Sequence, residues 1–279
     1  MSQQPKTMTG WIAFLDHAEI PVLKHTAREL ERLRADEEHL NARNASRIVA
    51  DDPLMTVKLL RYLQTHKRRS QMQEVVQIEQ AILMMGFDTF FREIPAMPIA
   101  EDMLHTHLDA LVHLLHTVRR AQRAAHWAYD WALRLHDLHA EEVFVSTLLA
   151  HVTEMLMWCF NTEAMLEIRK RQDADQTLRS RDLQNEIMGF IGADLQRALI
   201  AEWHLPQLLQ DLLDSSQAKT TRVRNITLAV NLARHSAKGW DDAALPDDYD
   251  AIAELLRIKP SKVMEIIGVA REAKSPDPA

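Results

Sequence analysis

Apolar side chains recur at intervals of three and four residues along most of the chain, which is the spacing of one face of an α-helix. Asp52-Pro53 can cap and open a helix, and Gly86 occupies a plausible C-cap position. The chain is therefore expected to be all-α. The pattern predicts helices over about residues 21–34, 38–50, 53–65, 76–86, 88–94, 101–135, 140–160, 183–201, 206–214, 221–236, 252–256 and 260–269.

Two features of this pattern bear on architecture. Segment 140–160 is apolar nearly all round, which predicts a helix at the centre of a bundle. Three stretches fall outside the helical pattern and are expected to be polar or solvated. They are the short N-terminal segment 1–17, the charged helix end and loop from Glu167 to Arg181, and an acidic loop from Trp240 to Asp250.

Composition agrees with a helical globular protein and limits the partners and the cellular compartment that are expected for it. Of 279 residues, 47% are hydrophobic and only 6 are glycine, a balance that favours helices over strands and tight turns. The net charge of −7 gives no global reason to bind nucleic acid or an anionic membrane. The only cysteine, Cys159, lies in an apolar run, and no signal peptide or apolar stretch approaching about 20 residues is visible. We therefore expect a cytoplasmic protein with no membrane partner.

Four phrases of the sequence, taken in order, resemble the HDOD domain, a relative of HD-type metal phosphohydrolases found in bacterial signalling proteins. The resemblance covers about residues 18–216 and implies an HDOD-type multi-helix bundle, with residues 217–279 as a C-terminal helical extension packed on the same body. The phrases are Ile48–Leu60 around Asp52-Pro53, Val75–Gly86, Glu142–Leu149, and Trp203-His204-Leu205-Pro206.

The chain departs from this family pattern where catalytic relatives hold metal. The His-Asp signature falls on Ala150 and His151, the upstream histidine falls near Arg119-Arg120, and the downstream His-His pair falls near Asp214. Such enzymes need imidazole and carboxylate ligands around a divalent metal. The resemblance therefore implies a scaffold without catalytic residues, metal ligands or a cofactor. The expected function is a non-catalytic bacterial regulatory module that binds a regulatory protein or a small signalling ligand.

Two groups of residues remain as candidate sites. The alternative function is a divergent metal-dependent phosphohydrolase using His126, His151, Glu154 and Asp214, although the histidine pairs in the sequence each supply only two ligands. Cys159 has the profile of an inert core thiol. The basic clusters carry no interleaved aromatic platform, which argues against nucleic acid. The candidate residual pocket consists of Arg120, His126, His151, Glu154, Trp203 and Asp214, and the candidate partner or anion surface consists of Arg61, Lys67, Arg68 and Arg69.

Overall fold

Helices form nearly all of the regular structure, as the hydrophobic spacing predicts. The computed structural model describes residues 5–66 and 77–269. Within them the chain forms α-helices, two short 3₁₀ turns and one parallel β-bridge between Val22 and Ile99, so the all-α prediction is confirmed. The helices are α1 (Met8–His17), α2 (Lys24–Ala35), α3 (Ala42–Ala50), α4 (Pro53–Thr65), α5 (Ile78–Met85), α6 (Phe87–Glu93), α7 (Ala100–Met103), α8 (Leu108–Arg134), α9 (Ala140–Leu148), α10 (Val152–Phe160), α11 (Thr162–Ala174), α12 (Ser180–Met188), α13 (Gly192–Glu202), α14 (Gln207–Asp211), α15 (Thr221–His235), α16 (Leu245–Leu256) and α17 (Pro260–Ile266).

The helix boundaries at Asp52-Pro53 and Gly86 follow from local chemistry. The Asp52 carboxylate accepts hydrogen bonds from the backbone N–H groups of Leu54 and Met55, at 2.9 and 3.2 Å, and so caps α4. Pro53 follows in the first turn, where its missing N–H costs nothing. Gly86 has φ 77°, a conformation that favours glycine, and it separates α5 from α6. Both boundaries predicted from the sequence are confirmed.

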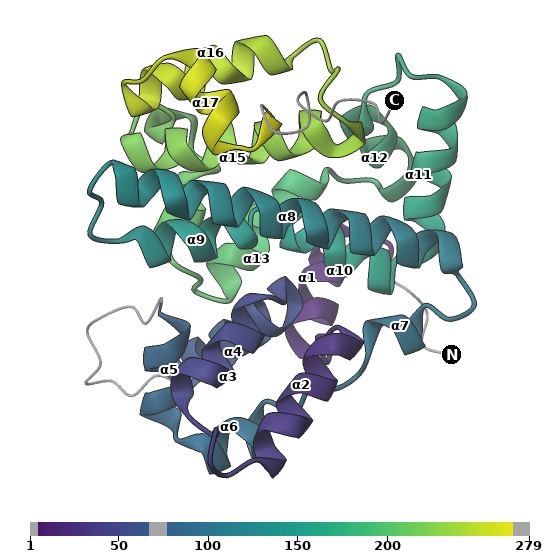
Figure 1. The fold of residues 1–279 in the computed structure, drawn as a ribbon. Coiled ribbons are helices and arrows are strands. Elements are labelled where there is room, and N and C mark those ends of the chain that lie inside the picture. The colour runs from purple at the N-terminus through teal and green to yellow at the C-terminus, as the bar shows by residue number, and fades with distance from the viewer. Residues whose placement is uncertain (1–4, 67–76, 270–279) are drawn as a thin grey trace, which may run out of the picture.

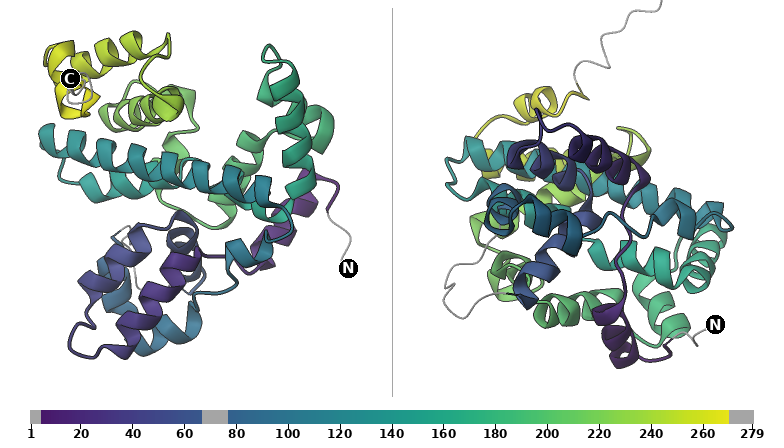
Figure 2. Two further views of the ribbon diagram at one scale, coloured as in Figure 1. Left: turned by 45° about the vertical axis from the view of Figure 1, so that its right-hand side comes forward. Right: turned by 90° about the horizontal axis from the view of Figure 1, so that it is seen from below.

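The long helix α8 organises the molecule. Figure 1 shows α8 crossing the middle, with α2–α6 on one side and α15–α17 on the other. Two hydrophobic clusters share it. The larger combines α1–α7, the first part of α8, the end of α9 and α10–α13. The smaller combines the second part of α8 with the start of α9 and with α15–α17. In the left view of Figure 2, α15–α17 and α11–α12 rise as separate arms from α8.

The described part of segment 217–279 packs on α8 chiefly through α15. Ile226, Ala229 and Leu232 of α15 are buried in the smaller cluster. Asn225 adds a polar contact, because its Nδ2 donates to the carbonyl oxygen of Ala128 at 2.9 Å. The extension therefore completes the burial of the second part of α8.

Several helices differ from the sequence prediction. The N-terminal segment contains α1, whose Trp11 and Leu15 are buried against the larger cluster; a helix with so few buried positions gives a weak periodic signal. Segment 101–135 is divided into α7 and α8. Most of the expected acidic loop belongs to α16, because Asp247 and Asp248 lie in its first turn, where acidic side chains favour the helix dipole. The charged stretch from Glu167 to Arg181 begins as predicted, with a helix end in α11 up to Ala174 and then a loop.

Segment 140–160 also differs, because it forms α9 and α10 with a break between them. Among the described residues, Ala140–Phe160 is the one stretch long and apolar enough to cross a membrane by length and composition, contrary to the expectation that none approaches that length. However, 72% of its apolar window is buried inside the protein. The segment therefore serves as the core of the bundle, and its central position is as predicted.

Candidate functional site

The break between α9 and α10 lies where the family resemblance places the His-Asp signature. Helical hydrogen bonding is interrupted there, and the Ala150 N–H bonds instead to the Thr147 carbonyl at 3.2 Å. The side-chain Nε2 of Gln196, on α13, donates to the Ala150 carbonyl oxygen at 2.6 Å. This contact satisfies a backbone group that the helix no longer uses. His151 consequently stands at the N-cap position of α10, beside α8.

An ion pair occupies the space beside His151. Arg120 Nη2, from α8, lies 3.3 Å from Oε2 of Glu154, and Thr117 Oγ1 lies 3.1 Å from Oε1 of the same carboxylate. Burial lowers the pKa of His151; the negative charge of Glu154 opposes that shift, and the positive charges of Arg120 and Arg234 add to it. His151 is therefore a neutral imidazole at neutral pH, next to a carboxylate that already has a cationic partner.

These residues do not fit the divalent metal that the resemblance to phosphohydrolases would imply. Ala150 has no ligating atom, and the Arg120 guanidinium neutralises Glu154 at close range. A metal ion there would also be repelled by the fixed positive charge. Within residues 5–66 and 77–269, no three His, Cys, Asp or Glu side chains form a group that could hold a metal ion.

The other members of the candidate residual pocket lie elsewhere. His126 is exposed on α8, with its ring against Phe144 at a centroid distance of 5.6 Å. Trp203 is buried, and its Nε1 donates to Asp16 Oδ1 at 3.2 Å. Asp214 is exposed and accepts hydrogen bonds from the backbone N–H and the hydroxyl of Ser216. The structure thus brings together Arg120, His151 and Glu154 only, and it does not assemble the ligand set of the alternative phosphohydrolase.

Arg61, expected on an anion surface, has a structural role instead. Its guanidinium donates to the carbonyl oxygens of Leu15, Asp16 and Ala18, at 2.9, 3.2 and 3.0 Å, and it lies 5.5 Å from the ring centroid of Trp203. Its donors are therefore directed at the end of α1. Lys67, Arg68 and Arg69 lie outside the described residues.

Cys159 offers no nucleophile. It is a buried free thiol, and burial raises its pKa to about 12. Because the thiolate is the reactive form, this cysteine is unreactive at neutral pH.

A groove that the sequence did not reveal lies about one end of α8, with a volume of about 700 Å³. It is formed by the turn between α8 and α9, by α14 and by the start of α15. We call it the α8–α15 groove. Its lining residues are Leu135, His136, Asp137, Leu138, His139, Glu142, Gln207, Leu208, Asp211, Thr220, Thr221 and Arg222.

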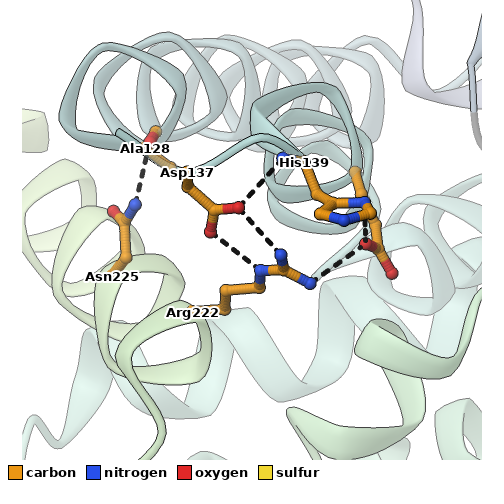
Figure 3. Close-up of polar contacts among 6 residues, drawn as sticks. Ala128, Asp137, His139, Arg222 and Asn225 are labelled. Atoms are coloured by element: carbon orange, nitrogen blue, oxygen red, sulfur yellow. Dashed lines mark hydrogen bonds and ion pairs between the residues drawn. The ribbon is translucent and has the colours of Figure 1, made fainter. Parts of the chain in front are cut away.

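Arg222 joins the two sides of this groove. Its Nε and Nη2 each lie 2.8 Å from an oxygen of Asp137, a bidentate pair, and its Nη1 lies 3.5 Å from Oε2 of Glu142 (Figure 3). The backbone N–H of His139 donates to Asp137 Oδ1 at 2.9 Å. Partial burial would raise the pKa of Asp137, but hydrogen bonds from Arg222 and His139, with the charge of Arg222, hold that pKa below its ordinary value.

The Asp137 pair predicts a pH-dependent contribution to stability. Because the folded-state pKa is lowered, the stabilisation is fully present above the ordinary value of 3.8 and is lost as the pH falls through the lowered value. At pH 7 we expect Asp137→Asn to reduce the free energy of unfolding by about 1–2 kcal/mol. Urea unfolding of both proteins at a series of pH values measures this difference, which should shrink toward zero below pH 3.8. The control is Asp130→Asn, which removes a more exposed ion pair with Arg134. An equal effect of both changes at pH 7 would contradict the prediction.

Sequence reasoning could not have located this groove directly. Asp137 and Arg222 are 85 residues apart, so no local motif joins them. The local signal is the short segment 136–139, in which three polar residues and Leu138 separate two apolar helices. Helix packing alone places the turn against the start of α15.

Comparison with known proteins agrees with this architecture. A model of the HDOD domain family matches residues 20–218, which is most of the chain. The chain belongs to the HDOD domain family. No curated protein matches it significantly.

Two solved structures share the fold over more of the chain than the family match covers. The MmoQ response regulator from Methylococcus capsulatus str. Bath has a TM-score of 0.67 at 17% identity, covering 90% of this chain and 99% of that one. A virulence factor from Campylobacter jejuni has a TM-score of 0.66 at 18% identity, covering 94% of this chain and 90% of that one. At this identity the likeness concerns the fold alone.

Proposed function

We propose that this chain is a non-catalytic regulatory module of bacterial signalling that acts in the cytoplasm by binding a regulatory protein or a small signalling ligand. The ion pair between Arg120 and Glu154, next to a neutral His151, carries the proposal. A guanidinium stands where the family resemblance places a metal-binding histidine, and Ala150 stands at the position of another. A fixed cation can hold the local carboxylate in place, but it cannot lower the pKa of a bound water as a divalent metal does.

Membership of a family found in signalling proteins supports the regulatory role. One protein of the same fold is a response regulator. The burial of the apolar segment 140–160 inside the bundle is consistent with a soluble protein, which supports the cytoplasmic assignment. An apolar core shared by the HDOD domain and the C-terminal extension provides a stable body on which a binding surface can be displayed.

Metal content tests the proposal. The untagged full chain, incubated with Mn²⁺, Fe²⁺ or Zn²⁺ and then desalted, should retain well below one metal ion per chain by elemental analysis. It should not hydrolyse bis(p-nitrophenyl) phosphate, and treatment with EDTA should leave Tm unchanged because no structural metal is removed. Stoichiometric metal that is lost in His151→Ala, together with chelator-sensitive hydrolysis, would contradict the proposal and favour the divergent phosphohydrolase.

A further inference from the structure

We infer that the α8–α15 groove is a docking surface for a basic segment of a partner protein. An apolar side chain of that segment packs against Leu138 and the apolar residues of the groove. The inference rests on the proposed function, since it names the surface through which a regulatory module would bind a protein. Three observations support it: an exposed apolar side chain on a fixed turn, a groove beside it, and the charge of the groove lining.

Leu138 is the exposed apolar side chain, with 94% of its surface accessible, at the tip of the turn between α8 and α9. The turn is held in place on both sides of this residue. The Asp137 N–H donates to the Ala132 carbonyl at 2.9 Å, and the Asp137 carboxylate accepts from His139 N–H and from Arg222. His136, just before it, has φ 56°, a left-handed conformation that is uncommon for a side chain of this size.

An exposed leucine on an ordered turn adds little to the stability of the fold, but it is well placed to bind a partner. A leucine exposed to this degree contributes almost no hydrophobic free energy to the folded state. Because its turn is already ordered, a partner that covers Leu138 loses little conformational entropy in fixing it. Leu135 and Leu208 line the groove beside Leu138, and Leu133, 51% exposed, lies on the same helix end. A protein segment therefore finds apolar contacts both at the rim and within the groove.

The charge of the lining selects the partner. Asp137, Glu142 and Asp211 contribute three carboxylates, against the single guanidinium of Arg222. Arg222 directs its donors at Asp137 and Glu142, so it is not offered to an anionic ligand. The lining therefore keeps a net negative charge. Because Asp137 and Glu142 are paired with Arg222 and only 15% and 18% exposed, Asp211 is the carboxylate of the lining that we expect to contact a lysine or arginine side chain.

Selection from a random dodecapeptide phage library on the wild-type full chain, with counter-selection on Leu138→Ser, tests the inference. Enriched peptides should carry lysine or arginine beside a large apolar residue. Synthesised and labelled, they should bind wild type in fluorescence anisotropy with an affinity that falls as NaCl is raised. Leu138→Ser should weaken binding by about tenfold or more, as for a central apolar contact, and Asp211→Asn should weaken it several-fold.

Matched control variants distinguish binding at this surface from nonspecific binding of the peptides to exposed apolar or acidic residues. Leu83→Ser removes a leucine that is 63% exposed on α5 and does not line the groove. Asp88→Asn also removes one negative charge, at an exposed position on α6. Both variants should bind the peptides like wild type. Because Leu138 is so exposed, its replacement should not affect folding, which unchanged Tm values would verify.

Three results would overturn the inference: no enriched peptide, enriched acidic peptides, or peptides that bind Leu138→Ser as tightly as wild type. Peptides sensitive to Leu83→Ser instead would place docking on another surface and leave the regulatory function standing. The proposed function is tested by a different measurement. Stoichiometric metal together with phosphodiester hydrolysis would contradict it, regardless of the result of the peptide selection.

Discussion

Asp52→Ala is expected to lower the free energy of unfolding by about 3–5 kcal/mol, a large share of the stability of a typical domain. The Asp52 side chain is fully buried. One oxygen accepts from the N–H groups of Leu54 and Met55 at the start of α4, and the other accepts from Leu23 N–H at 2.8 Å. Alanine would leave these three buried donors without an acceptor. Urea unfolding followed by circular dichroism measures the loss.

Neighbouring variants isolate the cause. Asp51→Ala changes an exposed carboxylate one residue away and should alter stability by about 0.5 kcal/mol or less. Asp52→Asn keeps one acceptor oxygen and should fall between wild type and Asp52→Ala. Burial raises the pKa of the Asp52 carboxyl and the backbone donors oppose that shift, so a neutral amide is partly tolerated. If Asp52→Ala destabilised the protein no more than Asp51→Ala, the role assigned to the cap would be wrong.

Arg61→Met is expected to reduce the free energy of unfolding by about 2–4 kcal/mol. Methionine retains an apolar stem against Trp203 but removes the donors that bind the carbonyl oxygens of Leu15, Asp16 and Ala18. These carbonyls lie at the C-terminal end of α1, where helical groups lack intrahelical partners. Hydrogen exchange with mass spectrometry should show that α1 loses protection, while α16 remains protected.

The control for this prediction is Arg92→Met on α6, which removes a largely exposed arginine paired with Glu93. It should leave both the unfolding free energy and the protection of α1 close to wild type. Loss of protection spread equally over α1 and α16 in Arg61→Met would show that Arg61 does not act locally on α1.

The region around the Arg120 ion pair and the α8–α15 groove have different expected roles. The first lies on α8 and α10, where the family resemblance places a metal centre, and its charges satisfy each other. The second lies at the C-terminal end of α8, where Leu138 is exposed and Asp211 lines the groove. We therefore expect partner binding at the second region and only an internal contact at the first.

Sequence patterns determined much of this protein. The spacing of apolar residues predicted most of the helices, because a helix on a core must present one apolar stripe regardless of where its partners come from in the chain. Local caps at Asp52-Pro53 and Gly86 set boundaries, since they depend on contacts within a few residues. The ordered phrases indicated the HDOD family, and the replacement of metal-ligating residues at Ala150 could be seen directly.

Only the tertiary structure decided which side chains meet. His126 and Asp214 were predicted to share a pocket with His151, but His126 packs against Phe144 and Asp214 bonds to Ser216. Arg61 was predicted to lie on an anion surface, but it donates to three carbonyl groups at the end of α1. Asp137 and Arg222 meet across 85 residues because α8 and α15 pack together. The sequence records the periodicity of each helix, since that depends on near neighbours, whereas the direction of each polar side chain depends on crossing geometry between helices that no local pattern specifies.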